Sequence, residues 1–143
     1  MNQTSYEKRS AYALELHDRN FSCAQSVACA CCDLVGLDEE TAFKIMEGFG
    51  GGMGGFTETC GALSGAVALV GYASSSGPDN PITKADTYKQ IAPLVERFRQ
   101  MEGSTRCGEL TGLAGGPRLQ QCTKLIEDCV RLTVELLDGA PTS

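Results

Sequence analysis

The sequence predicts an all-α protein, a single-domain bundle of about five to seven helices with a glycine-rich loop before the central helix. Apolar residues recur at helical spacing through most of the chain, and no stretch shows convincing strand alternation. A length of 143 residues fits one domain. We therefore assign residues 1–143 to one helical domain organised around cysteine motifs.

Two helices are expected at the start of the chain. Residues 6–19 place apolar side chains among charged ones, as on an amphipathic helix. Ser22 and Gln25 fit a capping box, in which the serine hydroxyl caps a helix and the glutamine reaches back to it. The helix that follows is expected to run to about Val35 and to end at Gly36.

A glycine-rich segment separates the next two expected helices. Asp38 is a suitable cap for the first of them. Residues 48–56 then contain six glycines in nine positions, which is too many for a regular helix. Thr57 or Thr59 is expected to cap a very apolar helix over residues 60–74. Because almost no charge interrupts this helix, we place it at the centre of the bundle.

Three helices are expected in the second half of the chain. Residues 83–101 read as a helix with Pro93 inside it, which predicts a kink or a break. A short helix is expected over residues 107–113. Pro117 suits a first helical position and predicts a last helix from there to about Asp138.

Charge and hydropathy exclude two classes of partner. The net charge is −6, from 12 basic and 18 acidic residues, and no basic cluster would attract nucleic acid. The longest apolar run, residues 60–73, is shorter than the roughly 20 residues that a membrane span needs. Residues 1–18 mix charged with apolar residues and lack the apolar core of a signal peptide. We expect a cytoplasmic protein with no membrane span and no nucleic-acid partner.

The eight cysteines carry the strongest functional signal. In a reducing compartment such a count indicates metal binding or redox chemistry. Cys23, Cys60 and Cys107 each fall at an expected helix start, and Ser104 or Thr105 is a possible cap for the last of these. Unpaired N–H groups and the helix dipole stabilise a thiolate there, and thiolates are both nucleophiles and metal ligands. Burial as small apolar side chains is the alternative interpretation.

The other cysteines have different settings. Cys122 and Cys129 belong to a series of residues spaced alternately three and four apart on the last expected helix, so both are expected to face the core. Cys29, Cys31 and Cys32 fall inside a helix. A Cys29-x-x-Cys32 pair is a weak sign of redox or zinc chemistry, and we interpret these three as packing residues.

Five motifs occur in a fixed order: Ser-Cys-Ala-Gln at Cys23, Gly-Phe-Gly-Gly-Gly-Met-Gly at 48–54, Glu-Thr-Cys-Gly-Ala-Leu-Ser-Gly at Cys60, Cys-Gly-Glu-Leu at Cys107, and Cys-Thr-Lys-Leu-Ile at Cys122. Together they resemble a bacterial family of redox-active proteins named for its pattern C, GCAxxG, C, C. The central motif here reads CGAxxG. The resemblance covers nearly the whole chain and implies that Cys23, Cys60, Cys107 and Cys122 act as one set.

The family also looks similar to the non-haem portion of split-Soret cytochromes, which favours an iron–sulfur cluster, 2Fe–2S in type, for electron transfer or redox sensing. The four cysteines would then be its ligands, and Glu58, Gly61 and Gly65 would lie beside it. The partner would be another redox protein, whose identity the sequence does not give. Two alternatives stay open. The same cysteines suit thiol–disulfide chemistry without metal, or a structural zinc site; no catalytic residue is assigned.

Two further expectations concern surfaces. Gly61 and Gly65 lie four residues apart, with Ala62 and Ala66 beside them, so another helix could approach closely and form a homodimer. His17, the sole histidine, is expected on a helix surface.

Overall fold

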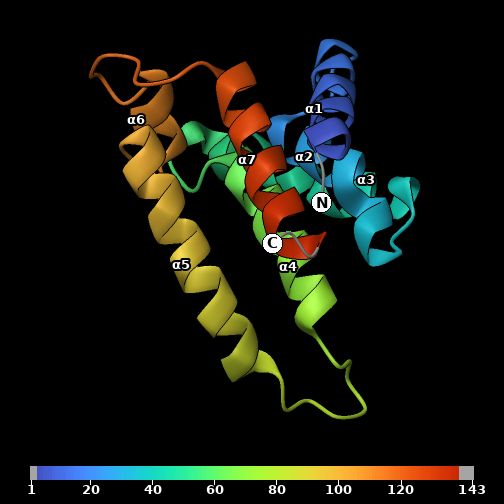
Figure 1. The fold of residues 1–143 in the computed structure, drawn as a ribbon. Coiled ribbons are helices and arrows are strands. Elements are labelled where there is room, and N and C mark those ends of the chain that lie inside the picture. The colour runs from blue at the N-terminus through green and yellow to red at the C-terminus, as the bar shows by residue number, and fades with distance from the viewer. Residues whose placement is uncertain (1–2, 139–143) are drawn as a thin grey trace.

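The computed structural model describes residues 3–138, and within that range it contains seven α-helices and no β-strand (Figure 1). The all-α prediction is therefore confirmed. Residues 1–2 and 139–143 of the predicted domain lie outside the described residues. No helix in the described part of the chain is long and apolar enough to cross a membrane. The helices are α1 (Gln3–Asp18), α2 (Cys23–Cys31), α3 (Glu39–Met46), α4 (Gly61–Ser74), α5 (Lys84–Glu102), α6 (Cys107–Thr111) and α7 (Cys122–Leu137).

The predicted helix caps before α2 and α3 are present. The Ser22 amide donates to the Gln25 side-chain oxygen at 3.0 Å, and the Gln25 amide donates to the Ser22 hydroxyl at 3.2 Å. This is a complete capping box, and it fixes Cys23 as the first residue of α2. A 3₁₀ turn extends α2 to Val35, as far as the sequence predicts. The Asp38 carboxylate accepts from the Thr41 amide at 2.9 Å.

Other helix starts differ from the prediction. Arg106, and not Ser104 or Thr105, occupies the capping position of α6. Neither Thr57 nor Thr59 caps α4, because Cys60 itself occupies the capping position. The last helix begins at Cys122 and not at Pro117. The segment before it folds back on α6, where the Leu110 carbonyl accepts from the Leu119 amide at 2.9 Å and the Gln120 amide at 3.1 Å. Those bonds hold the backbone out of a helix.

The predicted break at Pro93 is also absent, since α5 continues through it. Pro93 is exposed, as is Lys89, whose carbonyl loses its helical hydrogen bond there. Water can satisfy that carbonyl, so the proline is tolerated on this face.

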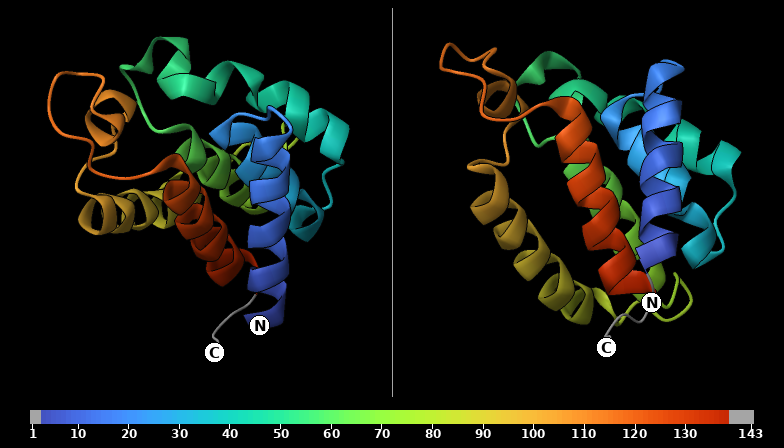
Figure 2. Two further views of the ribbon diagram at one scale, coloured as in Figure 1. Left: turned by 90° about the horizontal axis from the view of Figure 1, so that it is seen from above. Right: turned by 45° about the horizontal axis from the view of Figure 1, so that its top comes forward.

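Helix α4 lies at the centre of the bundle, in contact with α2, α5 and α7 (Figure 2). Gly61 and Gly65 face α2: a Cβ atom built on Gly65 would lie 2.8 Å from the Ala24 carbonyl oxygen. The two helices therefore approach as closely as their backbones allow. The small-residue face that suggested a homodimer is used inside the chain, which removes the basis for that expectation.

Candidate functional site

One cavity of about 380 Å³ is lined by cysteines from four different helices. We call them the site cysteines: Cys23, Cys60, Cys107 and Cys122. They are spread over most of the sequence, and only the tertiary fold brings them together. The cavity lies at the end of the bundle where α2, α4, α6 and α7 begin.

All four site cysteines lie at the N-terminus of a helix. Cys23, Cys107 and Cys122 are the first residues of α2, α6 and α7, and Cys60 caps α4. The sequence predicted this for three of them and missed it for Cys122, because Pro117 suggested an earlier start for the last helix. Unpaired backbone N–H groups at these positions favour negative charge on sulfur.

A short pair of extended segments holds Cys60 and Cys107 side by side. The Cys60 amide donates to the Thr105 carbonyl at 2.8 Å, and the Cys107 amide donates to the Glu58 carbonyl at 2.7 Å. Thr59 and Arg106 form an isolated antiparallel β-bridge between these two segments. Each segment is too short to show strand alternation, so sequence periodicity could not reveal this pairing.

The glycine-rich segment closes the cavity from another side. A Cβ atom at Gly52 would lie 2.4 Å from the Cys107 Cβ, and one at Gly50 would lie 2.6 Å from the Ser22 Cβ. These contacts explain two of the glycines: the backbone passes directly over the starts of α6 and α2. Gly51, Gly52 and Phe56 also line the cavity.

Cys23 and Cys122 form a thiol–thiolate pair. The hydrogen bond to Cys122 and burial raise the pKa of Cys23. The same bond, together with Arg118, lowers the pKa of Cys122 despite its partial burial. The Arg118 Nη2 donates to the Cys122 sulfur at 3.8 Å. The contact with Arg118 therefore favours negative charge at Cys122 over Cys23.

Arg118 and His17 are cavity residues that sequence reasoning missed. His17 is half-buried at the end of α1 and its Nδ1 lies 3.0 Å from the Phe21 carbonyl oxygen, so the predicted surface position is wrong. A carbonyl only accepts, so Nδ1 carries the proton in this hydrogen bond. His17 is the sole histidine in a chain with eight cysteines, and this could have indicated it as a site residue. Nothing in the sequence singled out Arg118.

The other two site cysteines differ in their surroundings. Burial raises the pKa of Cys60 to about 11, although the backbone amides of Ala62 and Leu63 act against it. Burial also raises the pKa of Cys107, and the nearby Cys122 adds to the rise. Both are therefore thiols at neutral pH, in a site that already holds one thiolate.

Glu58, Gly61 and Gly65 are the other residues expected beside a cofactor, and only Gly61 lines the cavity. Gly61 lines the cavity, whereas Gly65 packs against α2. The Glu58 side chain is exposed, and its backbone carbonyl holds the Cys107 amide. Among residues 3–138, no group of three or more Cys, His, Asp or Glu side chains is placed to hold one metal ion.

The remaining cysteines stay outside the cavity. These core cysteines are Cys29, Cys31, Cys32 and Cys129, all at most 4% exposed. Cys32 lies 3.5 Å from the Cys29 carbonyl and Cys29 lies 3.7 Å from the Glu39 carbonyl, so two of the thiols are engaged with backbone oxygens. Burial raises the pKa of Cys29 and of Cys31 to about 12. Their surroundings are those of packing residues.

Comparisons with known proteins agree with the grouping. A family model described as "Putative redox-active protein (C_GCAxxG_C_C)" matches residues 21–136, a range that contains all four site cysteines. A protein of Archaeoglobus fulgidus, described as "Uncharacterized protein", is 26% identical over 147 aligned residues, which cover 95% of this chain and 97% of the relative. No solved structure is measurably similar to the chain.

Proposed function

The chain belongs to this redox-active C_GCAxxG_C_C family, and on that premise we propose that the site cysteines hold an iron–sulfur cluster, of the 2Fe–2S type, for electron transfer or redox sensing. The observation that carries the proposal is the convergence of four helix-start cysteines on one cavity of about 380 Å³. Four thiolates are the usual ligand set of such clusters.

The donor set and the size of the cavity fit this group. Thiolates are soft anionic ligands, which suit iron and zinc alike. The cysteines, however, surround a volume and do not converge on one ion position. Helix N-termini around the cavity offset the negative charge that four thiolates would add.

The residues around the cavity have distinct roles in this proposal. Cys23, Cys60, Cys107 and Cys122 would ligate the cluster, which supplies one-electron chemistry when bound. Arg118 donates to the Cys122 sulfur and places a positive charge at the site. The glycine-rich segment covers Cys107 and limits the access of water. Hydrogen bonds and charges near the sulfurs are the means by which a protein sets the potential of such a centre.

Anaerobic purification followed by iron, sulfide and zinc analysis tests the proposal. We expect iron and inorganic sulfide in equal amounts, with visible absorption bands that bleach on reduction. Colourless protein that takes up no iron after reconstitution with iron and sulfide would reject it. Stoichiometric zinc, released by a chelator with loss of the helical circular dichroism, would instead identify a structural zinc site.

A second function is favoured by the Cys23–Cys122 pair. The hydrogen bond from Cys23 and the contact with Arg118 favour the thiolate at Cys122, the form that attacks a disulfide. With oxidised glutathione as the oxidant, the Cys122 thiolate would attack one of its sulfurs, break its S–S bond and release one glutathione thiolate. The Cys23 thiol would then give up its proton and displace the second glutathione thiolate, which forms the Cys23–Cys122 S–S bond. The two released thiolates take up the Cys23 proton and one proton from water. Among the site cysteines, the contact between Cys23 and Cys122 favours these two as the redox pair.

Mass spectrometry of metal-free protein in glutathione redox buffers tests this second function. We expect a reversible loss of two hydrogen atoms, located by proteolysis to the Cys23 and Cys122 peptides. Thiols that stay reduced across the whole buffer series would reject it.

A further inference from the structure

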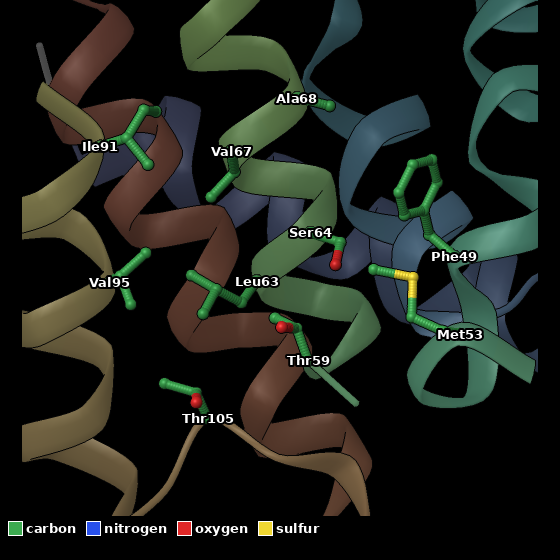
Figure 3. A pocket seen from close by; sticks show the side chains of 10 residues that line it. All are labelled: Phe49, Met53, Thr59, Leu63, Ser64, Val67, Ala68, Ile91, Val95 and Thr105. Atoms are coloured by element: carbon green, nitrogen blue, oxygen red, sulfur yellow. The ribbon is translucent and has the colours of Figure 1, made fainter. Parts of the chain in front are cut away.

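A second cavity, of about 360 Å³, adjoins the paired segments that carry Cys60 and Cys107 (Figure 3). Thr59 and Thr105 belong to those segments and line it. Helices α4 and α5 form two further walls, and the glycine-rich segment closes the remaining side with Phe49 and Met53. This cavity shares no lining residue with the cysteine cavity.

The walls of this second cavity carry no charge. Its ten lining residues include no Asp, Glu, Lys, Arg or His. An anion or a cation bound there would lose part of its hydration without gaining a charged partner, which is unfavourable. The cavity therefore selects an uncharged molecule.

Three hydroxyl groups interrupt the apolar lining, those of Thr59, Ser64 and Thr105. Within residues 3–138, none of these hydroxyls has a hydrogen-bond partner in the protein. All three residues are half-buried. In Figure 3 they lie toward the end of the cavity nearer the start of α4, apart from the aliphatic residues Val67 and Ile91. A ligand would therefore present its polar atoms to this end.

The glycine-rich segment presents Met53 to the cavity in an unusual backbone conformation. Met53 is left-handed, at φ 66° and ψ 36°, which non-glycine residues rarely adopt. A thioether and the Phe49 ring together suit an aromatic ligand, because sulfur and ring edges both pack favourably on aromatic faces. Met53 is also 45% exposed, so it can move to admit a ligand.

We propose that this second cavity binds an uncharged aromatic molecule of about two rings that carries a hydroxyl or carbonyl oxygen. A cavity of about 150 Å³ accommodates a benzene ring, so the observed volume of about 360 Å³ is sufficient for two. Pockets of roughly 300–1,000 Å³ with apolar walls and a few polar groups are the usual form of small-molecule sites. The bound molecule would lie against the backbone that positions Cys60 and Cys107.

Titration of the full chain with 2-naphthol tests the proposal. Calorimetry and changes in amide NMR chemical shifts measure the binding. We expect one site per chain with the largest shifts at Ser64, Ala68 and Val95. The charged analogue 2-naphthoate should bind more than about tenfold more weakly, because its carboxylate has no partner there. Naphthalene, which lacks the hydroxyl, should bind about threefold to tenfold more weakly.

Variants provide matched controls. Ala68→Phe fills the cavity from α4 and should abolish 2-naphthol binding, whereas Ala92→Phe adds the same ring on the exposed face of α5 and should leave binding unchanged. Thr105→Val keeps the shape of the side chain, removes one hydroxyl, and should weaken binding by about threefold to tenfold. Circular dichroism verifies the fold of each variant.

Three outcomes would overturn the proposal. They are equal binding of 2-naphthol and 2-naphthoate, unchanged binding by folded Ala68→Phe, and no 2-naphthol binding by folded wild-type protein. Light scattering adds a fourth: a wild-type dimer that Ala68→Phe converts to a monomer would show that a second copy of the chain occupies the cavity. None of these outcomes depends on whether the site cysteines hold iron.

Discussion

The site cysteines and the core cysteines are chemically identical side chains in opposite surroundings. Each site cysteine lies at a helix start, facing a cavity that Arg118 and His17 also line. Each core cysteine is at most 4% exposed and lies within a helix or a 3₁₀ turn. Burial alone does not separate the two groups, since Cys60 is 3% exposed. Position does: each site cysteine lies at the start of an α-helix, where backbone amides are unpaired, and no core cysteine does.

The largest expected difference is in cofactor content. Cys60→Ser and Cys122→Ser each remove one thiolate from the proposed cluster, and we expect iron and sulfide to fall by more than about tenfold in the purified protein. Cys29→Ala removes a thiol of the core group and should keep the wild-type iron content. If Cys29→Ala loses iron as completely as Cys60→Ser while remaining folded, the division of the cysteines is wrong.

The second expected difference is in the reactivity of the metal-free protein. At pH 7 we expect iodoacetamide to modify Cys122 first, since it is half-buried and its pKa is lowered by the hydrogen bond from Cys23 and by Arg118. Cys29 and Cys31 should react only after unfolding, because burial raises the pKa of each to about 12. The thiolate is the nucleophile, so rates should differ by more than about a hundredfold. Timed alkylation with peptide mass mapping measures this, and similar rates for both groups would contradict it.

The sequence predicted the helical elements better than the site. Local patterns indicated the seven α-helices of residues 3–138, and the capping box at Ser22 located Cys23 at its helix start. The pairing of residues 58–60 with 105–107, and the return of residues 119–120 to Leu110, are contacts between distant segments. No local pattern encodes them, so neither the true start of α7 nor the position of Arg118 could be predicted. Cys107 and Cys122 were assigned to the site mainly by the family resemblance.

A third prediction concerns the contact between the helices that carry Cys23 and Cys60. Gly65→Ala places a Cβ atom 2.8 Å from the Ala24 carbonyl, so α2 and α4 must move apart. We expect the free energy of unfolding to fall by about 1–3 kcal/mol. Gly71→Ala in the same helix meets only a methyl group at 3.9 Å and should raise it by about 0.5–1 kcal/mol. Urea denaturation measures both variants, and equal effects would show that the close approach does not limit packing.

The smallest expected effect is on the pH dependence of stability. It concerns Glu102 and Asp128, which are buried near the core cysteine Cys129. Glu102 has one carboxylate oxygen without a hydrogen-bond partner among the described residues. Burial and the neighbouring Asp128 raise the pKa of Glu102 to about 7, while Lys124 and Gln120 act against the rise. The folded protein therefore binds more protons than the unfolded chain between the ordinary glutamate pKa and about 7, and stability falls as the pH rises through that range.

Glu102→Gln should remove this pH dependence. The amide keeps an oxygen that can accept from Gln120 and gains N–H donors for Asp128. We expect little change in the free energy of unfolding at pH 5, where Glu102 is already protonated, and a gain on the order of 1 kcal/mol at pH 8. Urea denaturation across that pH range measures it, and the iron content should not change. A variant that keeps the wild-type pH slope would show that Glu102 is charged in the folded protein at neutral pH, and that Lys124 offsets its burial next to Asp128.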